Sequence, residues 1–115
     1  TRPLTSRSRA YQALTELSPD YASGHYHLAN IERRDGDLTR ALAGYQRAQE
    51  LAPGDYRAFL QAALIHHRAG RGGEVVPLAR KVLEIGPRRE RDRKMAESLL
   101  DRWRDSEPGR SDSIR

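Results

Sequence analysis

The repeat unit of this chain is residues 20–53, which read DYASGHYHLANIERRDGDLTRALAGYQRAQELAP. Residues 54–87, GDYRAFLQAALIHHRAGRGGEVVPLARKVLEIGP, have the same length and the same pattern of glycine and proline. These residues recur every 34 positions, at Pro19, Pro53 and Pro87 and at Gly36 and Gly70. A fixed period of this size is typical of stacked helical repeats. We therefore expect an all-α fold built from helical hairpins.

Two helices are expected in the unit, from about Ala22 to Arg34 and from about Leu38 to Leu51. The carboxylate of Asp20 can accept hydrogen bonds from the free amides at the start of the first helix, and Asp37 can do so for the second. Gly36 supplies the left-handed conformation that commonly ends a helix. The following unit is expected to repeat this hairpin around Gly70, with its second helix starting near Gly73 or Glu74 and Pro77 in the first turn.

Residues at helical spacing, most of them small or apolar, predict the packing faces. In the first unit these residues are His25, Leu28, Ala29, Glu32, Leu38, Ala41, Leu42, Tyr45, Ala48 and Leu51. In the second they are Ala58, Phe59, Ala62, Ala63, Ile65, His66, Val75, Leu78, Ala79, Val82, Leu83 and Ile85. Ala41 and Ala48 matter most, because helices joined by a short turn must approach closely there.

The two ends of the chain read as partial repeats. Residues 6–19 match the second half of the unit, with Ala10, Leu14 and Leu17 at helical spacing, and residues 1–5 are expected to be a frayed lead-in. Residues 88–105 carry one apolar stripe, which predicts a capping helix packed through Met95, Ala96, Leu99, Leu100 and Trp103. The polar residues 106–115 are expected to form a disordered tail. A half repeat at the start suggests that the chain is part of a longer protein.

Composition limits the function classes. The chain has 115 residues, which is one domain by length (1–105 without the tail), and a formal net charge of +5 with acidic residues interspersed. It has no cysteine, so no disulfide or thiolate site is available, which favours a reducing, cytoplasmic setting. No apolar run approaches the ~20 residues that cross a bilayer, and no targeting signal is visible, so membrane insertion is not expected.

The repeated residues resemble the tetratricopeptide repeat family, whose 34-residue pattern is W-x2-L-G-x2-Y, then A-x3-F, then P. The matching positions in the first unit are His25, Leu28, Ala29, Glu32, Ala41, Tyr45, Ala48 and Pro53. In the second they are Phe59, Ala62, Ala63, His66, Val75, Ala79, Val82 and Pro87. The resemblance implies an α-solenoid of about six helices, including the half repeat and the capping helix, with a concave groove lined by the first helix of each hairpin. It also implies a scaffold or adaptor that is not an enzyme.

The groove face follows from the side of each first helix that adjoins the packing face. Its candidate residues are Tyr26, Asn30, Arg33, Arg57, Leu60, Leu64, His67, Arg68 and Lys94. Arginine can bind a carboxylate through two hydrogen bonds, and the tyrosine and leucines can contact an apolar group. We therefore expect a protein or peptide partner, with an acidic one favoured. Of the Lys, Asn, Asn, Lys and Arg that form the carboxylate clamp of some family members, only Asn30 matches outright, so that clamp is not predicted.

Other functions have weaker support. Self-assembly, or docking onto upstream repeats, is the main alternative, because the first helix lacks the helix that would pair with it. Nucleic-acid binding is unlikely, because aromatic residues are only 6% of the chain and several fall on packing faces. His25 and His66 are expected to be partly buried, and no histidine pair has metal-ligand spacing, so no metal site is predicted. No cofactor site or catalytic constellation is recognisable, and the glycines at residues 70–73 lack the lysine of a phosphate-binding loop.

Overall fold

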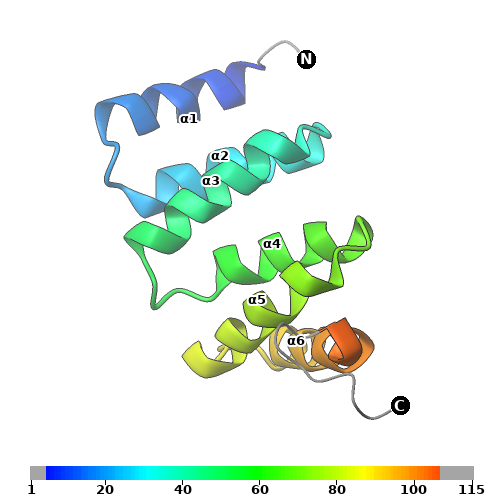
Figure 1. Cartoon of the computed structure of the whole chain (residues 1–115). Coiled ribbons are helices and arrows are strands. Elements are labelled where there is room, and N and C mark those ends of the chain that lie inside the picture. The colour runs from blue at the N-terminus through cyan, green and yellow to red at the C-terminus, as the bar shows by residue number, and fades with distance from the viewer. Residues whose placement is uncertain (1–4, 107–115) are drawn as a thin grey trace. The chain divides into compact units, whose positions relative to one another are not determined.

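The structure is a computed structural model that describes residues 5–106, which form six α-helices, one short 3-10 helix and no β-strand (Figure 1). In chain order the elements are α1 (Ser6–Leu17), α2 (Ala22–Arg34), α3 (Leu38–Leu51), α4 (Arg57–Arg68), α5 (Gly72–Ile85), α6 (Glu90–Arg102) and the 3-10 helix η1 (Arg104–Ser106). The predicted all-α class is confirmed for these residues. Residues 1–4 of the expected lead-in and residues 107–115 of the expected tail lie outside them.

The described chain divides into two compact units, one ending at Ala58 and the other beginning at Phe59. From here on, the first and second unit mean these two parts of the structure and not the 34-residue repeats of the sequence. The first unit contains α1, α2, α3 and the first two residues of α4. Within it, α1 packs against α2, and α2 packs against α3. The second unit contains the rest of α4 with α5, α6 and η1, and in it α5 packs against α6 and η1. Each unit thus has packed helices of its own.

The turns after α2 and α4 have the same backbone hydrogen bonds, 34 residues apart. Gly36 and Gly70 adopt positive φ angles of 86° and 76°, a conformation that glycine reaches without a steric penalty. The amide after each glycine then donates to a carbonyl five residues back, from Asp37 to Glu32 over 2.8 Å and from Arg71 to His66 over 2.9 Å. These bonds satisfy carbonyls that the helix end would leave free. The predicted left-handed helix end at Gly36, and its repetition at Gly70, are therefore confirmed.

The core between α2 and α3 depends on small side chains. Ala29 and Ala41 have no exposed area and Ala48 has 4%, as predicted from the spacing of small residues. A Cβ atom added at Gly44 would lie only 3.0 Å from the Cβ of Ala29, so the two helices approach closely at this level. Tyr45, also fully buried, is the largest of the fully buried side chains among the described residues.

Three residues that were predicted to pack in the core are exposed at the surface instead. Leu17 is 84% exposed and Leu38 is 43% exposed. Leu17 is the last residue of α1 and Leu38 the first of α3, so each side chain stands at a helix end, where a neighbouring helix covers less of the surface. Met95 is 37% exposed, because α6 packs through a narrower stripe that includes Ala96 and Leu99. These three core predictions are wrong.

The helix starts also required correction. Asp20 does not cap α2: Tyr21 is the N-cap residue, and no side chain bonds the free amides there. The Asp20 carboxylate instead lies 3.6 Å from the guanidinium of Arg47, on α3. Asp37 does cap α3, accepting a hydrogen bond from the amide of Arg40 over 3.3 Å. The first cap failed because Tyr21 intervenes between the aspartate and the helix.

Pro77 is not in the first turn of its helix. α5 begins at Gly72, so Pro77 is its sixth residue and lies inside the helix. A proline there removes one hydrogen bond and crowds the carbonyl four residues earlier, which belongs to Gly73. The predicted capping helix at residues 88–105 is shorter than expected, since α6 ends at Arg102 and η1 follows it through Ser106.

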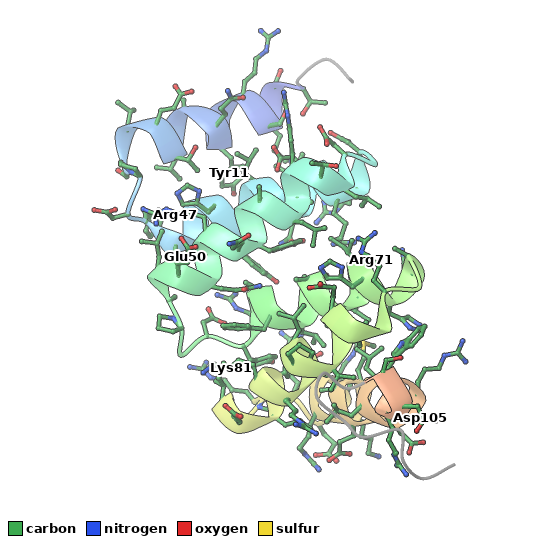
Figure 2. All side chains as sticks on the ribbon, in the orientation of Figure 1. Tyr11, Arg47, Glu50, Arg71, Lys81 and Asp105 are labelled. Carbon is green, nitrogen blue, oxygen red and sulfur yellow. The ribbon has the colours of Figure 1, made fainter. Side chains whose placement is uncertain are left out.

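Exposed helix faces carry charged side chains in short-range pairs. Figure 2 labels Arg47 and Glu50 on α3, whose charged groups are 3.2 Å apart, and Lys81 of α5, which lies 3.9 Å from Glu84. Pairs of this kind on a helix surface contribute only a few tenths of a kcal/mol each, about 0.2–0.5. They mark the surfaces that face solvent.

Candidate binding site

Three predicted groove residues lie on one face of α2. Tyr26, Asn30 and Arg33 are separated by four and three positions, a spacing that stacks side chains along one side of a helix. All three side chains are partly buried. They lie in the first unit, so their arrangement follows from the packing of that unit alone.

The hydroxyl of Tyr45 connects Asn30 with Arg33. It donates a hydrogen bond to the side-chain oxygen of Asn30 and accepts one from Nε of Arg33 over 3.2 Å. Burial raises the pKa of Tyr45, although the hydrogen bond from Arg33 acts in the opposite direction. The hydroxyl therefore stays protonated near neutral pH and holds both groove side chains in place.

This arrangement leaves hydrogen-bond donors available. Arg33 uses Nε for Tyr45, so its two terminal NH2 groups are not engaged by that bond, and Asn30 uses its oxygen, so its NH2 group also remains. Among residues 5–106, Arg33 forms no ion pair with a carboxylate. The face therefore offers a fixed cation and an amide donor.

Arg57 reaches the same face from the start of α4. Its guanidinium lies 4.8 Å from the centre of the Tyr26 ring, a cation–π distance. Asp55 holds it there through Nη2 over 2.6 Å and through Nε over 3.0 Å. The hydrogen bonds that Arg57 donates to Asp55 raise the pKa of Arg57 further. Arg57 thus forms a satisfied pair, in contrast to Arg33.

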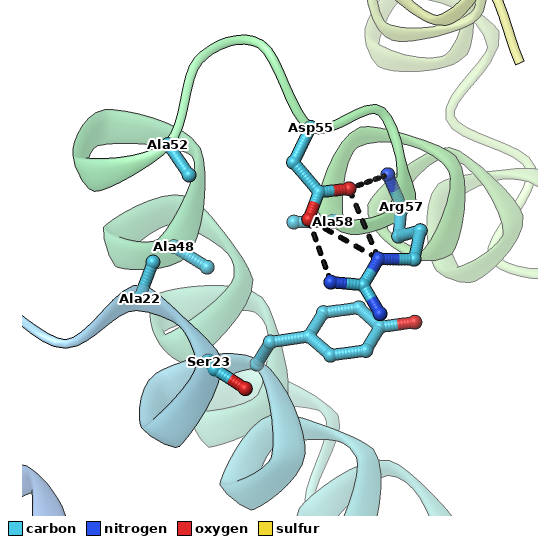
Figure 3. Close-up of a pocket in the computed structure, with 8 residues that line it drawn as sticks. Ala22, Ser23, Ala48, Ala52, Asp55, Arg57 and Ala58 are labelled. Atoms are coloured by element: carbon cyan, nitrogen blue, oxygen red, sulfur yellow. Dashed lines mark hydrogen bonds and ion pairs between the residues drawn. The ribbon is translucent and has the colours of Figure 1, made fainter.

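A pocket of about 190 Å³ opens beside the Tyr26 ring (Figure 3). Figure 3 shows alanine side chains from α2 and α3 on one side of it and the Asp55–Arg57 pair on the other. The eight lining residues are Ala22, Ser23, Tyr26, Ala48, Ala52, Asp55, Arg57 and Ala58. All of them lie in the first unit. The pocket has a largely apolar lining with a polar rim.

The remaining predicted groove residues lie in the second unit. Arg68 and Lys94 are exposed, and Leu64 is partly buried. Leu60 is buried, with only 4% of its surface exposed. His67 already has an internal partner, because its Nδ1 accepts a hydrogen bond from Nε1 of Trp103 over 2.9 Å. The structure thus brings Tyr26, Asn30, Arg33 and Arg57 together in one unit and locates the other five in the second.

Two important features of the site were missed from the sequence. Tyr45 was assigned to packing alone, although a buried tyrosine hydroxyl usually has a partner, and that rule could have linked it to Asn30. Asp55 is absent from the predicted site, although an aspartate two residues before a helix commonly accepts hydrogen bonds from the first amides of that helix. Its Oδ1 accepts from the amide of Arg57 over 3.1 Å.

No group of three or more histidine, cysteine, aspartate or glutamate side chains within residues 5–106 could hold a metal ion. His25 and His66 are partly buried, as predicted, and Nε2 of His25 donates to the carbonyl of Pro19 over 2.8 Å. None of the helices in this part of the chain has the length and apolar character needed to cross a membrane.

Comparisons with known proteins found neither a matching family model nor a matching curated protein for this chain.

Proposed function

We propose that this chain is a non-catalytic interaction module that binds an acidic segment of a peptide or partner protein on the face formed by Tyr26, Asn30 and Arg33. The observation that carries the proposal is the state of Arg33. Its guanidinium is oriented by the buried Tyr45 hydroxyl and has no carboxylate partner among the described residues. An oriented cation of this kind gains most from an acidic ligand, since less side-chain freedom is lost when it binds.

The chemistry of the neighbouring groups supports a carboxylate ligand. The terminal nitrogens of Arg33 can donate two parallel hydrogen bonds to one carboxylate, and the NH2 group of Asn30 can add a third. Hydrogen bonds to charged groups contribute about 1.5–3 kcal/mol each when they are partly shielded from water. A single acidic side chain at this point would therefore account for a measurable affinity.

We also propose that the hairpins belong to a tetratricopeptide-like array. The 34-residue period, the matching turns at Gly36 and Gly70 and the buried Ala41 and Ala48 support this proposal. In such an array the exposed Arg68 and Lys94 of the second unit would also be available to a partner.

Charge reversal at Arg33 tests the function. The probes are fluorescently labelled eight-residue peptides with four glutamates, the same peptides with four glutamines, and a panel in which the flanking residues vary. We expect the acidic peptides to bind and Arg33→Glu to weaken them by about tenfold or more, which is the loss of one charged contact. Arg9→Glu, an equal change of charge at an exposed position of α1, should leave the affinity unchanged.

Equal weakening by Arg9→Glu and Arg33→Glu would contradict the proposal, since it would mean that only net charge matters. Binding of the glutamine peptides as tight as that of the glutamate peptides would contradict it as well. Arg33→Lys gives a finer readout: it keeps the charge but loses the paired hydrogen bonds, so its affinity should fall between those of the parent and Arg33→Glu.

Self-assembly is the second candidate function. It is favoured by one observation: Leu17, at the end of α1, is 84% exposed, and the nearby Tyr21 is 51% exposed. Large apolar side chains that remain in water at one point of the surface are available for contact with another protein, including a second copy of this chain.

A further inference from the structure

We propose that the pocket beside Tyr26 binds an aliphatic side chain of the ligand, three residues along the ligand chain from the carboxylate that contacts Arg33. This inference rests on the proposed function and adds a sequence preference to it. The pocket and Arg33 lie in the same unit and are connected by Tyr26, whose ring borders the pocket and lies 5.8 Å, centre to centre, from the ring of Tyr45.

The lining of the pocket fits an aliphatic group. Four of its eight residues are alanines: one from the start of α2, one from α3, one directly after α3 and one from α4. Ala22 and Ala52 are only partly buried, so they leave open a space that a larger residue at either position would fill. A volume of about 190 Å³ admits one branched aliphatic side chain. Contact with methyl groups and an aromatic ring favours such a side chain through removal of apolar surface from water.

The charges at the rim argue against an ionised group inside the pocket. Asp55 and Arg57 neutralise each other through a bidentate contact, and Arg57 also lies over the Tyr26 ring. A ligand carboxylate at this point would face Asp55, and a ligand cation would face Arg57. An uncharged side chain meets neither repulsion. The acidic group of the ligand must therefore lie away from the pocket, where Arg33 has no internal carboxylate partner.

The distance along α2 sets the ligand spacing. Tyr26 and Arg33 are seven residues apart, which is about 10 Å along a helix. An extended peptide advances about 3.3 Å per residue, so three residues cover about the same distance. A ligand lying along α2 would then place an aliphatic side chain in the pocket and a carboxylate at Arg33 when the two are three positions apart.

The experiment is a series of labelled peptides that contain one leucine and one glutamate, separated by one to five positions in either order, in a serine–glycine background. We expect the affinity to be highest at a separation of three. Replacing the leucine with serine in that peptide should weaken binding by about tenfold or more, from the loss of one buried aliphatic side chain. Filling the pocket with Ala52→Leu should abolish the difference between the leucine and serine peptides.

A matched set of variants keeps the two proposals separate. Ala52→Ser, which keeps the pocket open, should retain the leucine preference. Circular dichroism of both Ala52 variants serves to check that they remain helical. Ala22→Leu fills the same pocket from α2 and should act like Ala52→Leu. Binding that depends on Arg33 but shows no leucine preference, or an equal affinity at every separation, would overturn the pocket assignment and leave the proposed function intact. Acidic peptides that bind without any dependence on Arg33 would overturn the proposed function itself.

Discussion

Glu32 and His66 occupy equivalent positions, 34 residues apart, and at both positions the surroundings favour the uncharged side chain. Burial, followed by the charge of Asp37, raises the pKa of Glu32 above 4.5. Burial, followed by the charge of Arg71, lowers the pKa of His66 below 6.5. The backbone carbonyls of Glu32 and His66 also accept the hydrogen bonds that end their helices. The repeat therefore places an ionisable side chain beside a helix end where its charge is disfavoured.

The lowered pKa of His66 predicts that the stability of the fold depends on pH. Because the pKa of His66 is lower in the folded chain, the unfolded chain binds more protons in the interval between the two pKa values. The free energy of unfolding should therefore decrease as the pH falls below about 6.5, and this contribution should be fully lost below the folded-state pKa. The change should be small, since the ring is only partly buried.

Urea unfolding at pH values from 5 to 7.5 measures this contribution against a control. The Nδ1 atom of His66 accepts a hydrogen bond from Nε of Arg71 over 2.8 Å, which requires the neutral ring. His66→Asn can accept the same bond through its amide oxygen but does not titrate. The variant should show a smaller pH dependence than the parent chain. Identical pH profiles for the two would show that His66 does not contribute.

At the scale of elements, the side chain of Trp103 packs the end of α6 against the start of α5. Trp103, the only tryptophan, follows α6 directly and donates its hydrogen bond to His67 of α4. Its ring meets the imidazole edge to face, with centres 5.9 Å apart. Gly72 lies under this ring, at the first position of α5. The glycine thus leaves room for Trp103.

Gly72→Ala is therefore expected to destabilise the second unit. The added Cβ would lie 2.3 Å from Cε3 of Trp103 and 2.6 Å from Oγ of Ser106, so the ring and η1 would have to move. Overpacking of this kind costs about 1–3 kcal/mol. It should outweigh the gain of about 1 kcal/mol that alanine brings to a helix. Chemical denaturation followed by tryptophan fluorescence measures the result.

The adjacent residue supplies the control for this prediction. A Cβ added at Gly73 would meet nothing closer than 3.9 Å, so Gly73→Ala should be neutral or stabilising by up to about 1 kcal/mol. Equal effects of the two substitutions would show that Trp103 does not restrict the start of α5.

The helices could be predicted from the sequence where a local signal defines them. The bounds Ala22–Arg34 and Leu38–Leu51 were predicted correctly, because Gly36 and the proline at position 53 mark the helix ends chemically. The start of α5 was placed one or two residues late. Its first residue, Gly72, precedes the predicted start, and the reason for that glycine is a tryptophan 31 positions later. No local pattern contains such a contact.

The candidate site was predictable only in part, for a similar reason. The helical spacing of Tyr26, Asn30 and Arg33 follows from the sequence, and the structure keeps them on one face. The pocket depends on Ala22 of α2 and on Ala52 and Asp55 of the loop after α3, and these residues meet only when α2 and α3 are packed. The pairing of Arg57 with Asp55 also separates its role from that of Arg33, although both arginines look alike in the sequence.

At the scale of the whole molecule, the positive charge is unevenly distributed. Residues 59–115 contain 13 of the 21 basic side chains and 9 of the 16 acidic ones, so they hold a net +4 of the total of +5. The first unit, which carries the candidate site, is nearly neutral. Attraction of an acidic ligand to that site therefore depends on the local environment of Arg33, because a general positive field is absent there.

The exposed residues near the end of α1 raise the question of the oligomeric state. Leu17 and Tyr21 together expose on the order of 300 Å² of side chain, which is no more than the largest apolar patch of an ordinary monomer. A stable interface between proteins covers about 800 Å² on each partner. These two side chains are too small a surface to hold a dimer without many further contacts.

We therefore predict that the chain is a monomer in sedimentation experiments from about 10 μM to about 500 μM, since the exposed apolar surface is well below that of a stable interface. Leu17→Ser should leave both the sedimentation coefficient and the free energy of unfolding unchanged within about 0.5 kcal/mol, because the side chain is already in water. A concentration-dependent dimer that disappears in Leu17→Ser would instead favour self-assembly as the function. A monomer that binds acidic peptides through Arg33 would favour the interaction module, because the face of α2 then acts without a second copy.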